Sequence, residues 1–236
     1  MTDTKVISRA GAEYPAGLVR ALGPKAPNDL YFIGNIELLR VPGVGFCGSR
    51  KASIQGLEVA RDCASQAAEM GLSVVSGNAA GVDAEAHYHA LASGGTTVLV
   101  LPEGIEKFRI RESLKSVWDW DRVLVISQFK PNEVWQAFRA MARNKVIIGL
   151  SRAMIVIEAG DRGGTLDAGK SALELDIPLF VAKYGSVSED ARGNEILLGL
   201  GALPLSKLRS TMRANMDRVR NAITDPSDFV RSKRLL

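Results

Sequence analysis

The sequence SGNAAGVDAEAH, residues 76–87, directly follows the apolar run at residues 72–75. A strand that breaks at a Ser-Gly pair and reopens as a helix places backbone N–H groups and small side chains at the carboxyl edge of a sheet, where α/β folds bind ligands. Similar breaks, rich in glycine or small residues, follow Cys47 and Glu158. The three breaks together predict one composite site that binds an anion such as phosphate.

Apolar, mostly β-branched runs alternate with helical patterns from Pro42 onward. The predicted strands are residues 44–47, 72–75, 96–101, 123–126, 153–157 and 179–182, and the predicted helices are residues 54–70, 83–92, 134–147 and 166–175. Continuous apolar strands that alternate with helices are typical of parallel sheets covered on both faces. The sequence therefore predicts an α/β fold, with a doubly wound, mostly parallel sheet and helices on both faces.

The pattern divides the chain into three parts. In residues 1–40, prolines after Tyr14, Gly23 and Ala26 interrupt short apolar pieces, which predicts an irregular extension packed on the core. Residues 41–205 form the predicted α/β domain. Residues 206–236 are predicted to be a basic amphipathic helix and a tail.

The prediction for this C-terminal segment rests on apolar spacing and on charge. Its apolar residues recur at intervals of three or four: Leu205, Leu208, Met212, Met216, Val219 and Ile223. That spacing predicts a helix of about five turns whose apolar stripe packs on the domain or on another subunit. The segment holds eight Lys or Arg and three Asp residues, in a chain of net charge +4. These charges indicate either a DNA contact or a solvated face, and both alternatives stay open.

Composition is that of a folded globular protein. Of the 236 residues, 46% are hydrophobic and 24% are charged. No apolar stretch approaches the roughly 20 residues of a membrane span. Because the N-terminus also lacks the apolar run of a signal peptide, we expect a cytoplasmic protein with no membrane contact.

Familiar cofactor and metal motifs are absent or misplaced. A match to GxGxxG at residues 43–48 precedes and spans a predicted strand instead of following it, and no P-loop motif is present. The two cysteines, Cys47 and Cys63, and the two histidines, His87 and His89, lack the spacing of zinc ligands. We therefore expect no cofactor, no metal ion and no disulfide.

The first break carries groups suited to a phosphate. Gly48 permits a tight turn, Ser49 can cap a helix or bind an oxyanion, and Arg50 offers a guanidinium fork.

In the second break, Ser76 and Gly77 form the turn, and Gly81 lets the backbone approach closely. Asp83 is predicted to be an N-cap or first-turn residue, and His87, one turn further on, a packing or hydrogen-bonding residue. Both are therefore expected to support the site.

Two later segments add groups that suit an anion. Gly163, Gly164 and Thr165 open a predicted helix with backbone N–H groups and a hydroxyl. In the other segment, Arg143 and Lys145 place two cations around the amide of Asn144. A solvated helix surface is the alternative for the second segment.

The order and spacing of these segments resemble the DNA-processing protein A (DprA/Smf) family of bacterial recombination mediators. The resemblance rests on GSRK at residues 48–51, on residues 76–87, on GGT at 94–96, and on RNKVI and GLS within 143–159. It extends from about residue 14 to residue 205, which is most of the chain.

This resemblance implies a Rossmann-like domain that binds single-stranded DNA, forms a homodimer and hands the strand to the RecA recombinase during uptake of transforming DNA. It implies a binding protein without a catalytic residue. The residues that the resemblance places at the DNA are Gly48, Ser49, Arg50, Lys51, Ser76, Gly77, Arg143, Asn144, Lys145, Gly163, Gly164 and Thr165, with Gly81, Asp83 and His87 in support.

The chain also departs from the family pattern. Ala80 stands where the family usually has arginine, and residues 107–130 diverge. Within that region several basic residues remain, and Phe108 offers a ring for base stacking. The family's N-terminal helical domain and C-terminal winged-helix domain are missing, so we expect a minimal or divergent member. These departures weaken the expectation of a RecA partner more than that of DNA binding.

A different use of the same fold is the main alternative. Proteins of the lysine-decarboxylase-like type cleave or sense nucleotides with a PGGxGTxxE motif, and here Ala168 stands where the catalytic glutamate would fall. That residue disfavours hydrolysis and leaves a nucleotide-binding sensor open. Single-stranded DNA needs an extended basic groove, whereas a mononucleotide needs only a small pocket.

Overall fold

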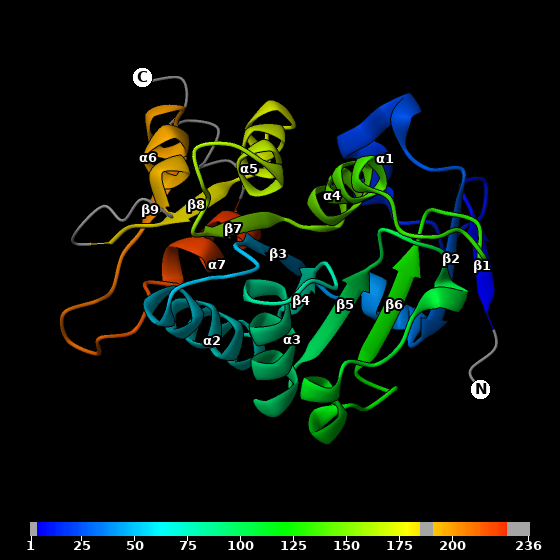
Figure 1. Ribbon diagram of the computed structural model, residues 1–236, viewed down its shortest axis with the longest axis horizontal. Helices are drawn as coiled ribbons and strands as arrows, with labels where there is room; N and C mark the ends of the chain where they lie inside the picture. The colour runs from blue at the N-terminus through cyan, green and yellow to red at the C-terminus, as the bar shows by residue number, and fades with distance from the viewer. Residues whose placement is uncertain (1–3, 185–190, 226–236) are drawn as a thin grey trace.

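A single twisted sheet organises the protein (Figure 1). The computed structural model describes residues 4–184 and 191–225. Nine strands lie in the order β1-β2-β6-β5-β4-β3-β7-β8-β9. They are β1 Lys5–Ser8, β2 Asp29–Gly34, β3 Gly43–Gly48, β4 Ser73–Ser76, β5 Thr96–Val100, β6 Val123–Ser127, β7 Ala153–Ile157, β8 Leu179–Ala182 and β9 Leu203–Leu205. The neighbours from β6 to β9 pair in parallel, while β1 pairs with β2 and β2 with β6 antiparallel.

Helices cover both faces of this sheet (Figure 1). The helices are α1 Ala16–Leu22, α2 Ile54–Glu69, α3 Val82–Ala92, α4 Ala137–Leu150, α5 Gly164–Glu174, α6 Arg192–Gly199 and α7 Asp217–Thr224. One hydrophobic core joins α1, α4, α5 and α6 to the sheet, and another joins α2, α3 and α7 to its opposite face. The predicted α/β fold, doubly wound with a mostly parallel sheet, is therefore confirmed.

The extension at residues 1–40 is more regular than predicted. Its β1 and β2 continue the sheet beyond β6, with Tyr31 opposite Ser127 and Phe32 opposite Ile126. In β2 the side chains of Leu30 and Phe32 are buried and their neighbours less so, the alternation of a strand with one face on the core. The prolines around this segment hid the alternation, so the prediction of an irregular segment was wrong while its packing on the core is observed.

The long C-terminal helix was also predicted wrongly. Leu205 ends strand β9, Met212 has a positive φ of 57°, and the helix α7 begins only at Asp217. Leu205, Met216, Val219 and Ile223 are buried as their spacing suggested, whereas Met212 is 66% exposed. A loop precedes the helix: Arg213 is 2.7 Å from Asp62 of α2, which accepts a bond from Ala214 N. These contacts fix residues 206–216 in a non-helical path. The basic residues beyond 225 lie outside the described residues, so a DNA contact by the tail stays a prediction.

The strand order places a topological switch between β3 and β7. The chain leaves β3 toward β4 on one side, builds β5 and β6, crosses through α4, and returns to β7 on the other side of β3. Ligands of open α/β sheets bind outside the carboxyl ends of the strands at such a point. Within the described residues, no helix is long and apolar enough to cross a membrane.

Candidate functional site

A pocket of about 240 Å³ lies at this switch point. Its walls come from the end of β3, the loop after β4, the helix α4 and the start of α5. The residues predicted from the sequence that line it are Gly48, Arg50, Asp83, Arg143, Asn144, Gly164 and Thr165. Residues from all three predicted breaks, together with α4, therefore line one cavity.

The first wall is the turn after β3. Ser49 N donates to Ile157 O at 3.3 Å, and the Ser49 hydroxyl accepts a bond from Lys51 N at 3.1 Å. A Cβ at Gly48 would lie 2.3 Å from Ile157 O, so only glycine fits between β7 and α3. Ser49 thus shapes the turn, Arg50 is exposed at the pocket, and Lys51 is exposed outside its lining.

The second wall is the loop between β4 and α3, residues 77–81. Asp83 accepts bonds from Ser76 Oγ at 2.9 Å and from Ala79 N at 3.1 Å. Gly81 has a φ of 73°, and a Cβ there would lie 2.4 Å from Ser49 O, because this loop packs directly on the turn after β3. The carboxylate of Asp83 therefore holds the loop in shape, as an N-terminal aspartate does.

His87 contacts the same loop through a ring nitrogen. Its Nε2 lies 2.6 Å from Gly77 O, and its Nδ1 lies 2.6 Å from Thr97 Oγ1. Burial lowers the pKa of His87, and only the Nε2–H tautomer of the neutral ring donates to the Gly77 carbonyl. Both ring nitrogens are therefore engaged in fixing the loop.

Arg143 is the most unusual residue of the pocket. It lies on α4 and is only 6% exposed, yet its Nε has no hydrogen-bond partner among the described residues. Its Nη1 lies 1.7 Å from the point where a Cβ would stand on Gly77, so glycine makes room for the guanidinium. Burial lowers the pKa of Arg143 and the nearby Asp83 carboxylate raises it, but an arginine stays protonated. A buried cation with an unsatisfied donor at a pocket wall suits an anionic ligand.

The third wall is the start of α5. Thr165 Oγ1 donates to Gly48 O at 3.2 Å, and Asn144 Nδ2 donates to Gly164 O at 3.3 Å. Gly163, with a φ of 104°, caps the helix from outside the pocket lining. The first N–H groups of α5 have no partners within the helix and favour an anion.

Sequence reasoning missed the use of Glu158. This buried residue accepts a bond from Ser53 N at 2.7 Å and another from the Ser53 hydroxyl, which in turn accepts from Gly56 N. The carboxylate therefore fixes the N-terminus of α2 and is not a pocket group. Ser53 is recognisable as a helix cap from the sequence, but a partner 105 positions away is not.

Two side chains that were expected at the site lie elsewhere. Lys145 is exposed and lines a second pocket on the other side of Asn144. Phe108 is 7% exposed and packs 5.8 Å from Trp118, so the prediction that it stacks on a base is wrong. In the divergent region, the guanidinium of Arg111 donates to the carbonyl and side-chain oxygens of Asn78, in the loop after β4.

Exposed apolar side chains gather just before and within α4. They are Val134, Trp135, Phe138 and Met141, each about half exposed or more. Met141 lines the pocket itself, so this surface is continuous with it. Exposed rings beside a cationic pocket suit base stacking.

The pocket holds no activated nucleophile among its described residues. Burial raises the pKa of the Cys47 thiol to about 12, with the Asp83 carboxylate adding to the effect. At neutral pH the thiol is therefore protonated and a poor nucleophile.

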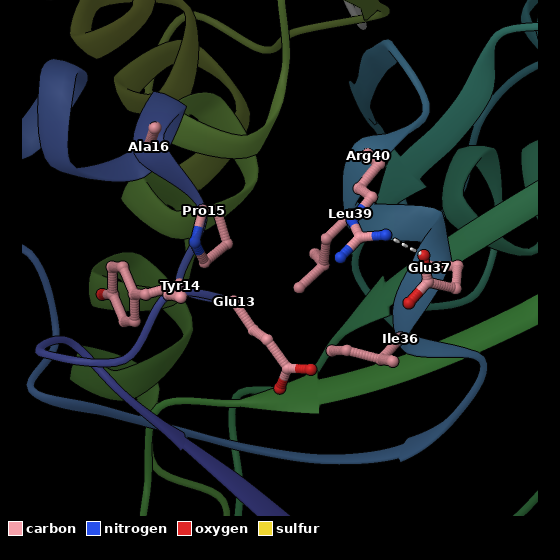
Figure 2. Close-up of a pocket in the computed structure, with 9 residues that line it drawn as sticks. Glu13, Tyr14, Pro15, Ala16, Ile36, Glu37, Leu39 and Arg40 are labelled. Carbon is pink, nitrogen blue, oxygen red and sulfur yellow. Dashed lines mark hydrogen bonds and ion pairs between the residues drawn. The ribbon is translucent and has the colours of Figure 1, made fainter.

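A third cavity, of about 160 Å³, lies away from the ends of β3, β4 and β7, beside the segment that follows β2. Figure 2 shows it between Glu13, Tyr14 and Pro15 on one side and the short helix Ile36–Arg40 on the other. Its one cation, Arg40, is 2.5 Å from Glu37 and so is already neutralised. None of the residues predicted from the sequence to bind a ligand line it.

Comparisons with known proteins give a consistent answer. The profile of the DNA recombination-mediator protein A family matches residues 5–215. DNA processing protein DprA of Streptococcus pneumoniae is 38% identical over 151 residues, which is 63% of this chain and 53% of that protein. An X-ray structure of DprA from the same species has a TM-score of 0.77 at 32% identity and covers 86% of this chain and 71% of that chain.

A second structure, of DNA processing protein A from Helicobacter pylori, describes how that protein binds single-stranded DNA. Its TM-score is 0.72 at 23% identity, over 86% of this chain and 93% of that chain, a likeness of fold. The chain spans about half the length of the first curated relatives that it matches, 53% and 51%.

Proposed function

This chain belongs to the DNA recombination-mediator protein A family, and on that premise we propose that it binds single-stranded DNA in the pocket at the ends of β3, β4 and β7. The observation that carries the proposal is Arg143, a buried cation whose Nε lacks a partner in the described part of the chain. A phosphate in the pocket, whose lining includes Arg143, would lie beside this positive charge. The DNA-binding relative of the same fold supports the choice of ligand.

The other groups of the pocket fit the same ligand. Arg50 is exposed at the mouth and offers a fork to a backbone phosphate, while the start of α5 offers N–H groups. Trp135 and Phe138 lie exposed nearby and offer rings to bases. We assign no chemical step to the site, since the Cys47 thiol is protonated and both nitrogens of His87 are occupied.

Replacing Arg50 tests the assignment. We expect Arg50→Ala to bind oligo-dT about 1.5–3 kcal/mol more weakly, because a charge-assisted contact is lost. Affinity is measured by a gel-shift titration at two salt concentrations. Arg40→Ala serves as the control, since Arg40 is an exposed arginine of the remote cavity. Equal affinity of Arg50→Ala and the parent would remove this turn from the site.

A nucleotide sensor is the competing function, and the same protein preparation separates the two. If the pocket serves a strand, oligo-dT binds far more tightly than any mononucleotide, and its affinity falls steeply as salt rises. A mononucleotide that matches oligo-dT would favour the sensor.

The whole protein's role goes further than the pocket. We propose that the protein acts in the cytoplasm, hands its strand to a RecA-type recombinase during uptake of transforming DNA, and does so as a homodimer. For the dimer, support comes from Ile196 of α6, which is 39% exposed, and from Leu200 at the C-cap of that helix, which is 54% exposed and lies three residues before the edge strand β9. Exposed apolar pairs next to an open sheet edge favour self-association.

The dimer proposal makes a simple prediction. Leu200→Glu places a charge on the apolar surface of α6 and is expected to convert the dimer to a monomer on a sizing column. Met212→Glu changes an even more exposed apolar residue, 66% against 54%, in the loop before α7, and should leave the size unchanged. A parent protein that already elutes as a monomer would refute the dimer and leave the DNA pocket untouched.

A further inference from the structure

A second pocket, of about 350 Å³, lies against α4 beside the first. The two pockets share Met141 and Asn144, so these side chains form the wall between them. The new pocket extends from α4 to α1 and α5, which also contact α4. It is the larger of the two cavities.

Its chemistry is that of a nucleotide site. Lys25 and Lys145 bring two exposed ammonium groups, neither of which has an ion pair among residues 4–184 and 191–225. Gln128 adds an amide that can meet a base edge. Asp167 is the one carboxylate in the lining, so the lining residues carry a net positive charge. Leu22 and the alanines of the lining add apolar surface for a base.

We propose that this pocket is a second nucleotide subsite, in which the strand continues from the first pocket across Asn144 and Met141. A phosphate of the strand lies between Lys25 and Lys145, and the base rests on the apolar wall. This inference rests on the proposed function, because it extends the same strand. It differs from a mononucleotide site because the shared wall makes the two cavities consecutive positions on one track.

One consequence concerns the N-terminal extension. Lys25 ends the short helix Gly23–Lys25 directly after α1. The extension therefore supplies a cation to the DNA track in addition to two strands of the sheet.

Comparing ligand lengths tests the second subsite. We expect Lys25→Ala to bind oligo-dT about tenfold more weakly, the effect of one charge-assisted contact, and to lower the salt slope by about 0.7. Binding of the mononucleotide dTMP, which needs only the first pocket, should be unchanged. Lys25→Arg should retain most of the affinity, because it keeps the charge. Lys5→Ala, in the outer strand β1, serves as the control.

The outcomes separate this inference from the function on which it rests. A parent protein that does not bind oligo-dT refutes both. A parent that binds oligo-dT, together with a Lys25→Ala variant of equal affinity, overturns the second subsite alone. A variant that loses dTMP and oligo-dT binding in equal proportion also overturns it, since Lys25 would then act on the first pocket.

Discussion

Arg143→Met is expected to bind single-stranded DNA about a hundredfold more weakly than the parent and yet to be more stable toward urea. The loss of binding follows because Arg143 is the buried cation of the pocket and its charge-assisted contacts each contribute about 1.5–3 kcal/mol. The gain in stability follows because a buried charge without full hydrogen bonding opposes folding. Replacing a complete buried ion pair by apolar residues stabilises proteins by up to about 1–4 kcal/mol. Here the Asp83 carboxylate remains, held by its bonds to Ser76 and Ala79, so the gain is expected at the low end of that range.

Two measurements on one variant check this expectation. Oligo-dT affinity is measured by fluorescence anisotropy, and the free energy of unfolding by urea denaturation. Arg143→Lys is the matched control, since it keeps the charge but not the planar fork, and it should weaken binding without the gain in stability. Asp83 keeps its bonds to Ser76 and Ala79 in either variant. A Met variant that is less stable than the parent would show that Arg143 is a structural residue.

Gly81→Ala is expected to have the largest effect on folding, a loss of about 3 kcal/mol or more. At a φ of 73° and ψ of −128° an L side chain is strained, and its Cβ would lie 2.4 Å from Ser49 O and 2.8 Å from Arg50 O. Backbone strain of this kind costs about 1–3 kcal/mol, and overpacking adds about 1–3 kcal/mol. Because the clash is with the turn after β3, the folded fraction should also bind oligo-dT more weakly.

Gly94→Ala separates the two contributions. Gly94 has a φ of 78°, but a Cβ there would meet no atom within 4 Å. This variant therefore measures backbone strain alone, and a loss of about 1–2 kcal/mol is expected in urea denaturation. Equal losses for the two alanine variants would contradict the close packing of the Gly81 loop on the Ser49 turn.

The sequence predicted the parallel part of the fold because local signals and tertiary structure agree there. The run at residues 153–157, for example, is apolar throughout and becomes the fully buried strand β7. The same agreement fails at residues 205–223, where spacing alone suggested a helix but Asp62 and Arg213 fix a loop. Such long-range contacts leave no mark on local periodicity.

At the candidate site, too, local features were predictable from the sequence and long-range ones were not. The three breaks after β3, β4 and β7 were recognisable, because glycine-rich turns after apolar runs are local features. The directions of Arg143, Asn144 and Lys145 were not resolved, although consecutive helix residues point about 100° apart. On α4 this geometry buries the first, places the second in the wall between pockets, and exposes the third on the far side. The burial of Phe108 depended on Trp118, which only the folded loop brings near.

The pairing of β3 with β7 has a mechanical consequence. The two strands are joined by backbone bonds from Val44 opposite Ala153 to Gly48 opposite Ile157, which ends at the pocket. They belong to opposite halves of the sheet, one built from β3 to β6 and the other from β7 to β9. On the proposed function, a DNA strand in this pocket would contact both halves at once. Tension on that strand would then load the β3–β7 ladder, where five residue pairs join the halves, and not a single surface loop.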